Sequence, residues 1–103
     1  MASDTQVAKK YLSLQQSAHY RGLEFNLSLT SVRNIMNAQK CYYTGKRISY
    51  NAPGTSPNKL TFDRKDASLG YIKGNVVACS HEFNQKKSSL SIKDIELLAR
   101  KLL

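Results

Sequence analysis

The stretch that decides the fold runs from residue 60 to residue 87 and reads LTFDRKDASLGYIKGNVVACSHEFNQKK. Its opening apolar run ends on Asp63, its middle turns through two glycines, and its end is a helix-like segment that carries His81 and Asn84. A strand that delivers a carboxylate and a helix that presents His or Asn three to four residues apart can hold one divalent metal ion between them. The stretch therefore predicts a metal site, and its Arg and Lys residues predict a phosphate beside it.

The basic residues of the chain gather around this stretch. The sequence has sixteen Lys and Arg against seven Asp and Glu, a formal net charge of +9. Between residues 40 and 87 there are nine basic and three acidic residues. Clustered positive charge is the electrostatic footprint of a nucleic-acid-binding protein, and such binding weakens steeply with salt. A basic surface that only keeps the protein soluble is the alternative.

Length and composition predict one domain, and the helices and hairpin expected below give it the α+β class. The 103 residues suit a single compact domain, and an apolar content of 41% excludes a fully disordered chain. The two cysteines, Cys41 and Cys79, stand far apart, which suits a reducing cytoplasm and leaves a disulfide as the alternative. No apolar run approaches the roughly 18 residues of a membrane span, and the N-terminal residues lack a signal-peptide core. The expected location is cytoplasmic, with no membrane partner.

Periodic apolar residues predict helices before the central stretch. Residues 4–20 carry apolar side chains at the spacing of one helical face, and Gly22 is placed to end that helix. A second helix is expected over residues 31–38, with Thr30 or Ser31 as its N-cap. These two helices are expected to fill residues 1–39.

A hairpin and two further helices are expected in the rest of the chain. The first strand is predicted within residues 41–49 and the second at about residues 59–63, separated by a polar loop with both prolines. The run Ser91-Ile92-Lys93-Asp94 is a capping box that predicts a last helix. The predicted organisation is one domain, 1–103, with a hairpin-and-helix core in residues 40–88 and a C-terminal helix in residues 89–103.

Several pieces of the sequence together resemble the HNH endonucleases (ββα-metal or His-Me finger proteins) of bacteriophages and mobile elements. They are Asp63-Arg64, Gly70-Tyr71, Gly74-Asn75-Val76-Val77 and Asn84-x-x-Lys87, preceded by Ala18-x-x-Arg21-Gly22-x-x-Phe25-x-Leu27 and Cys41-Tyr42-Tyr43-Thr44-Gly45. The likeness spans about residues 18–88. It implies a β-hairpin and a helix around one metal ion, packed by N-terminal and C-terminal helices. It also implies a metal-dependent endonuclease, in the host cytoplasm if phage-encoded.

The resemblance assigns the metal ligands. Asp63 is the first and Asn84 the second, and both are hard oxygen donors that suit Mg²⁺ or Mn²⁺ better than zinc. The remaining positions go to water and to a phosphate oxygen. A surface-turn carboxylate and a solvated helix residue are the plainer interpretations of these two. Asn75 is assigned to brace the loop. The cysteine pairs that bind zinc in many relatives are incomplete here, so no structural zinc is expected.

Arg64 departs from the family pattern at the position of the general base. The usual residue after the acidic ligand is a histidine that deprotonates the attacking water. A guanidinium stays protonated and cannot be this general base, so Arg64 is assigned to clamp the phosphate. The base is then a metal-activated water, His81 or Asp66, and His81 without any role is the alternative. The side chains predicted to contact nucleic acid are Arg64, Lys65, Lys73, Lys86 and Lys87.

Three functions follow from these features. The first is metal-dependent hydrolysis of DNA phosphodiester bonds, with double-stranded DNA as the expected partner. The ligand pair Asp63 and Asn84 favours it, because a pure binding protein needs neither. The second is a catalytically inactive, HNH-derived DNA-binding or inhibitory protein, which Arg64 favours. The third is a basic protein that uses the fold to grip another protein.

Overall fold

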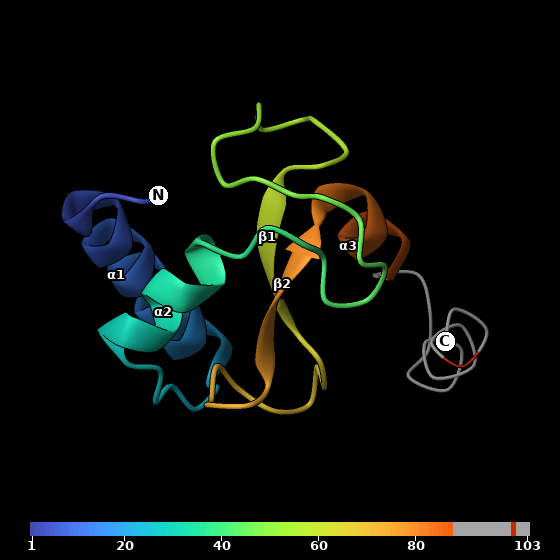
Figure 1. Ribbon diagram of the computed structural model, residues 1–103. Helices are drawn as coiled ribbons and strands as arrows, with labels where there is room; N and C mark the ends of the chain where they lie inside the picture. Colours follow the sequence, from blue (N-terminus) through green and yellow to red (C-terminus); the bar gives the residue numbers. More distant parts are fainter. Residues whose placement is uncertain (88–99, 101–103) are drawn as a thin grey trace.

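The computed structural model describes residues 1–87 and residue 100. Figure 1 shows an antiparallel hairpin with two helices on one side and a third helix on the other. In chain order the elements are α1 (Asp4–Arg21), α2 (Leu29–Met36), β1 (Leu60–Arg64), β2 (Val76–Ser80) and α3 (His81–Lys87). The predicted α+β class is confirmed. The C-terminal helix predicted for residues 89–103, with its capping box, falls outside the described residues apart from residue 100.

Helix α1 forms where the sequence predicts it. The Ser3 hydroxyl accepts a hydrogen bond from the Gln6 N–H (3.1 Å), and the Gln6 side chain accepts one from the Ser3 N–H (2.8 Å). This reciprocal capping box satisfies two backbone donors that the first turn leaves unpaired. Gly22 ends the helix in the left-handed region, with φ 66°. The buried face consists of Val7, Leu14 and Ala18.

Helix α2 begins and ends two residues before its predicted bounds. Its N-cap is Ser28, whose hydroxyl accepts from the Ser31 N–H at 3.0 Å, so the choice of Thr30 or Ser31 as cap is wrong. Three hydroxyl residues near the start make the local capping signal ambiguous. The structure uses Ser28, and Val32 and Met36 on the inward face of the helix are fully buried.

The predicted first strand of the hairpin is wrong. Residues 41–49 contain no strand, and the neighbouring backbone makes only isolated bridges, Lys40 with Arg47 and Ser49 with Lys59. Strand β1 pairs instead with β2, in an antiparallel register that sets Asp63 opposite Val77. The aromatic run before Gly45 turns rather than extends, because Gly45 has φ 72° and its N–H bonds to the Cys41 carbonyl at 2.9 Å.

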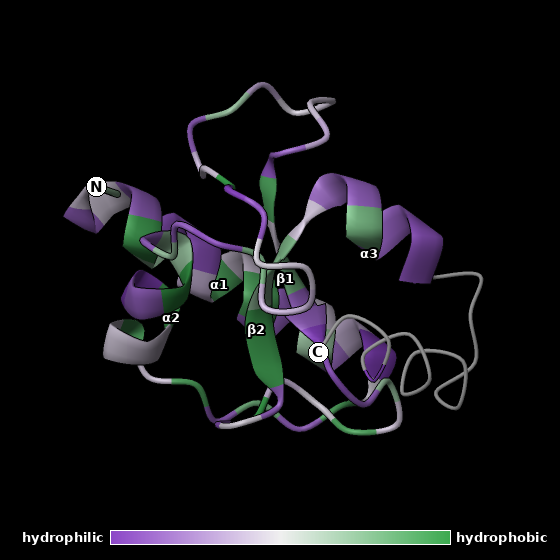
Figure 2. Ribbon diagram, turned by 45° about the vertical axis from the view of Figure 1, so that its right-hand side comes forward, coloured by the Kyte–Doolittle hydropathy of each residue, from purple (hydrophilic) through white to green (hydrophobic). Residues whose placement is uncertain are grey.

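The core lies on the side of the hairpin that faces α1 and α2. Figure 2 shows apolar residues on the hairpin and on the facing parts of those two helices, whereas α3 is largely hydrophilic. One buried cluster joins α1 and α2 to Tyr71 and Val76, and a second joins Cys41 and Ile48 to the hairpin. Both cysteines are buried free thiols. Within the described residues, no helix combines the length and the apolar character needed to cross a membrane.

The loop between the strands is anchored to the segment after α1. The Tyr71 N–H donates to the Glu24 carbonyl at 2.8 Å, and the Asn26 N–H donates to the Tyr71 carbonyl at 3.1 Å. The backbone at Phe25 forms a single parallel bridge with Tyr71. Gly70 makes this approach possible, because a Cβ there would lie 2.1 Å from the Glu24 carbonyl oxygen.

We predict that Gly70→Ala lowers the free energy of unfolding by about 2–3 kcal/mol, because the added methyl group forces two backbone segments apart. Urea denaturation followed by circular dichroism measures the change. Gly54→Ala is the matched control, since a Cβ at Gly54 would meet no atom within 4 Å. Equal stability of the two variants would contradict the close approach.

Candidate active site

Asp63 lies on the face of β1 that is turned towards α3. Alternate residues of a strand share a face, so Thr61 and Asp63 lie together while Phe62 joins the core on the other side. The Asp63 side chain is only 9% exposed. Its Oδ2 atom accepts hydrogen bonds from the Tyr43 hydroxyl at 2.6 Å and from Lys87 Nζ at 2.5 Å. Two donors therefore hold one oxygen of a buried carboxylate.

Helix α3 presents Asn84 and Lys87 to the same face, one helical turn apart. Asn84 Nδ2 donates to Thr61 Oγ1 at 3.0 Å, and Lys87 Nζ donates to the Arg64 carbonyl oxygen at 2.6 Å. The start of α3 is tied down as well, since the Ser80 hydroxyl accepts from the N–H three residues along the chain at 3.1 Å. The two predicted metal ligands, Asp63 and Asn84, thus lie on facing elements.

Tyr43 completes this arrangement, although no motif in the sequence marks it as a site residue. Its ring stacks on Phe83 of α3, with centroids 4.8 Å apart, and Lys87 Nζ lies 5.2 Å from its centroid. Burial, the hydrogen bond to Asp63 and the charge of that carboxylate raise the pKa of Tyr43, so its hydroxyl stays protonated and donates. The signal in the sequence was the aromatic pair before Gly45, which was interpreted as strand.

Arg64 points into the loop that follows β1. Its Nη1 atom donates to the carbonyl oxygens of Ala67 at 2.8 Å and of Leu69 at 3.0 Å, and its guanidinium lies 5.4 Å from the Tyr71 ring centroid. Neighbouring strand residues face opposite sides, which separates this side chain from Asp63. The contacts describe a brace for the loop, and the role of phosphate clamp stays a prediction.

Asn75 ties the two ends of that loop together. Its Oδ1 atom accepts from the Asp66 N–H at 3.0 Å, and its Nδ2 atom donates to the carbonyl oxygens of Asp66 at 3.2 Å and Gly70 at 2.9 Å. The Asp66 carboxylate accepts from the hydroxyl and N–H of Ser68, which lowers the pKa of Asp66. A carboxylate with a lowered pKa is a weaker base, so Asp66 is a poor candidate for the general base.

The remaining predicted residues differ in their exposure and contacts. His81 is the first residue of α3, partly exposed and one turn before Asn84. Lys65, Lys73 and Lys86 are exposed, with Lys65 Nζ 5.3 Å from the ring centroid of Tyr42. Lys87 differs, because its side chain is 10% exposed and paired with Asp63. Its assignment to nucleic acid stays a prediction.

The donor set suits a hard divalent cation. Within residues 1–87, the hydrogen bonds from Tyr43 and Lys87 both fall on Oδ2 of the Asp63 carboxylate, so its Oδ1 can still act as a ligand. Asn84 uses its amide nitrogen on Thr61, so its Oδ1 remains an acceptor. The part of the chain described here holds no group of three or more His, Cys, Asp or Glu side chains able to cage a metal. Two oxygen donors suit Mg²⁺ or Mn²⁺ that completes its shell with water and a phosphate.

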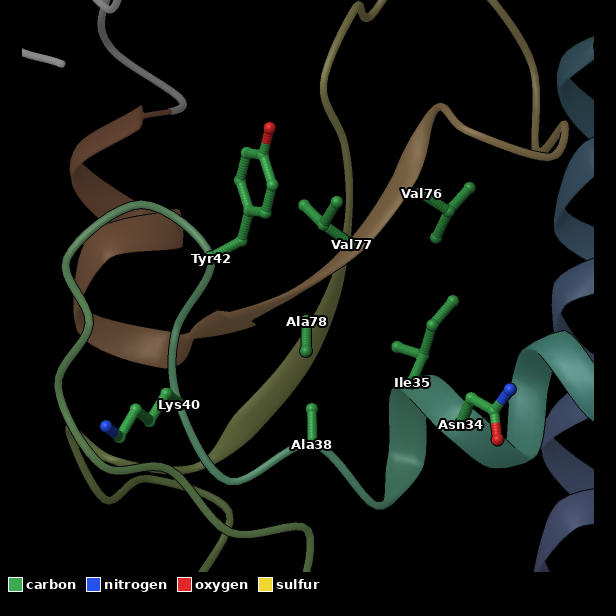
Figure 3. A pocket seen from close by; sticks show the side chains of 8 residues that line it. All are labelled: Asn34, Ile35, Ala38, Lys40, Tyr42, Val76, Val77 and Ala78. Carbon is green, nitrogen blue, oxygen red and sulfur yellow. The ribbon is translucent and has the colours of Figure 1, made fainter.

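An apolar hollow of about 290 Å³ lies elsewhere, between α2 and β2 (Figure 3). Its lining residues are Asn34, Ile35, Ala38, Lys40, Tyr42, Val76, Val77 and Ala78. None of the predicted site residues lines it. The candidate site is therefore the polar surface between β1 and α3, and this hollow takes no part in it.

Comparison with known proteins confirms the fold. No family model matches the chain. An uncharacterized 29.0 kDa protein of Enterobacteria phage T4, from the dda-modA intergenic region, is 33% identical over 81 residues. These are 79% of this chain but 32% of the phage protein, so the chain spans about a third of that relative. The rare-cutting HNH restriction endonuclease PacI has a similar structure, with a TM-score of 0.65 at 19% identity, covering 99% of this chain and 82% of that chain. The chain has the HNH fold.

We predict that Asn75→Ala lowers the free energy of unfolding by about 2–3 kcal/mol, because it leaves buried backbone groups at Asp66 and Gly70 without partners. The midpoint of urea denaturation measures this effect. The matched control is Asn51→Ala, at an exposed position in the polar loop. A midpoint unchanged from the wild type would show that the loop holds itself without this side chain.

Proposed function

We propose that this chain is a metal-dependent HNH endonuclease that hydrolyses phosphodiester bonds in double-stranded DNA. The observation that carries the proposal is the placement of Asp63 on β1 and Asn84 on α3, two side chains with oxygen donors on facing elements of an HNH fold. The phage relative and the net charge of +9 also support it.

Asp63 and Asn84 are the residues that would hold Mg²⁺ or Mn²⁺. The metal, when bound, supplies positive charge to the scissile phosphate. Asp63 is held in place by Tyr43 and Lys87, and Asn84 is oriented by Thr61. Ligands fixed by neighbouring hydrogen bonds need little rearrangement to bind a metal, which favours selective coordination.

The exposed lysines Lys65, Lys73 and Lys86 are proposed to contact the DNA backbone. All three side chains are exposed, and phosphate contacts of this kind position the duplex without reading its sequence. Tyr42 adds an aromatic side chain that is 59% exposed and lies next to Lys65. The site therefore combines a metal position with a basic rim.

His81 is proposed as the general base that takes the proton from the attacking water. Arg64 is excluded because a guanidinium has no free lone pair, and Asp66 is held in its turn by Ser68. His81 lies one turn before Asn84 on the same stripe of α3, and an imidazole is the side chain that most often serves this purpose.

A second candidate function is an HNH-derived protein that binds DNA without cutting it. The observation that favours it concerns Arg64. This residue stands where the family usually has a histidine, and its guanidinium donates hydrogen bonds to two carbonyl oxygens of the loop. No base then follows Asp63 directly. Nicking of supercoiled plasmid separates the two functions, because only the enzyme cuts in Mg²⁺ or Mn²⁺ and stops in EDTA.

We predict that Asp63→Asn abolishes metal-dependent nicking but keeps DNA binding in EDTA, because it removes the charged ligand and preserves the shape of the side chain. Plasmid nicking and an electrophoretic mobility assay measure the two properties. Asp4→Asn is the matched control, since Asp4 pairs with Arg33 on the helical side of the molecule. Wild-type protein that binds DNA and never nicks it would favour the second function.

We predict that His81→Ala lowers the nicking rate by about 10²–10⁴, the usual contribution of a general base, with little change in DNA affinity. Single-turnover nicking in Mg²⁺ measures it. The other histidine supplies the control, because His19 lies exposed on α1 beside Tyr20. If the His81 variant cuts at the wild-type rate, the metal-activated water needs no side-chain base.

A further inference from the structure

The ammonium group of Lys87 lies inside the candidate site. Its Nζ atom is 2.5 Å from Asp63 Oδ2 and 2.6 Å from the Arg64 carbonyl oxygen. The ring of Tyr43 covers it at 5.2 Å from the centroid. Three electron-rich groups, two from β1 and one from the segment before it, therefore converge on one cation, and one of them is the carboxylate proposed as the first metal ligand.

The two charges depend on each other because both are withdrawn from water. The side chains of Lys87 and Asp63 are 10% and 9% exposed. A buried carboxylate without a counter-charge is strongly unfavourable, and removal of either member of such a pair leaves the other uncompensated. Lys87 thus provides the positive charge that a divalent cation would also bring to Asp63.

We infer that Lys87 is an internal counter-ion of Asp63 that competes with the divalent cation for this carboxylate and so weakens metal binding in the DNA-free protein. The inference rests on the proposed function only where it involves the metal, since the ion pair stands without it. A cation on Asp63 Oδ1 would lie close to an ammonium held on Oδ2 of the same group. Like charges at such a separation repel strongly away from bulk water.

The adjacent lysine provides a matched control. Lys87→Met removes the charge and keeps an unbranched stem of similar length. Lys86→Met removes the same charge from the next position, where the side chain is 70% exposed and lies 3.7 Å from Glu82. Tyr43→Phe removes the other hydrogen bond to Asp63 Oδ2 without changing charge. The three variants separate local charge, net charge and hydrogen bonding.

The test is calorimetric titration of Mn²⁺ into the DNA-free protein. We expect Lys87→Met to bind Mn²⁺ at least about tenfold more tightly than the wild type, with Lys86→Met within about twofold of it. Lys87→Gln, which keeps a hydrogen-bond donor, provides a second neutral variant if the methionine variant does not fold. If both neutral variants bind Mn²⁺ no more tightly than the wild type does, the inference is wrong. The proposed metal site itself is not contradicted by that result.

A metal-free measurement keeps this outcome distinct from failure of the proposed function. Lys87→Met should lower the melting temperature in EDTA, and adding Asp63→Asn to that variant should restore part of the loss. Absence of this coupling would overturn the counter-ion role even if Mn²⁺ binds. If no protein, the wild type included, binds Mn²⁺ while the coupling is present, the metal site itself fails and the competition falls with it.

Discussion

A buried carboxylate must be partnered, and much of the arrangement around the hairpin follows from how Asp63 meets that requirement. Tyr43 reaches it from the segment between α2 and β1, and Lys87 reaches it from α3. Neither donor is near Asp63 in sequence, so the contact joins three separate parts of the chain. The interactions that hold the proposed metal ligand are therefore also tertiary interactions that set where these segments lie.

The backbone carbonyl groups of the loop between the strands also need hydrogen-bond partners. Asn75 and Arg64 bind carbonyl oxygens within the loop, and Gly70 lets it rest directly against Glu24. These contacts fix the end of β1 from the side opposite α3. Asp63 is thus held between a braced loop and a helix, and such support allows a two-ligand site to keep its geometry before any ligand arrives.

Local signals made α1 predictable, because its cap, its apolar face and Gly22 all act within a few residues. The residues quoted for the HNH resemblance also led to the correct fold. The strand pairing could not be derived in this way, since the aromatic run before Gly45 and the run from Val76 to Ser80 both have strand-like composition. The roles of Tyr43 and Lys87 depend on contacts 20 and 24 residues away in sequence, which no local pattern encodes.

Helix α3 has no fully buried residue, and its hold on the hairpin comes from the polar pairs Asn84–Thr61 and Lys87–Asp63 and from the stacking of Phe83 on Tyr43. The groups that would perform the chemistry are thus the same groups that fasten the helix. A substitution that changes this reactive centre therefore also changes how α3 is attached. An evolutionary route to a new activity here would have to meet both requirements together.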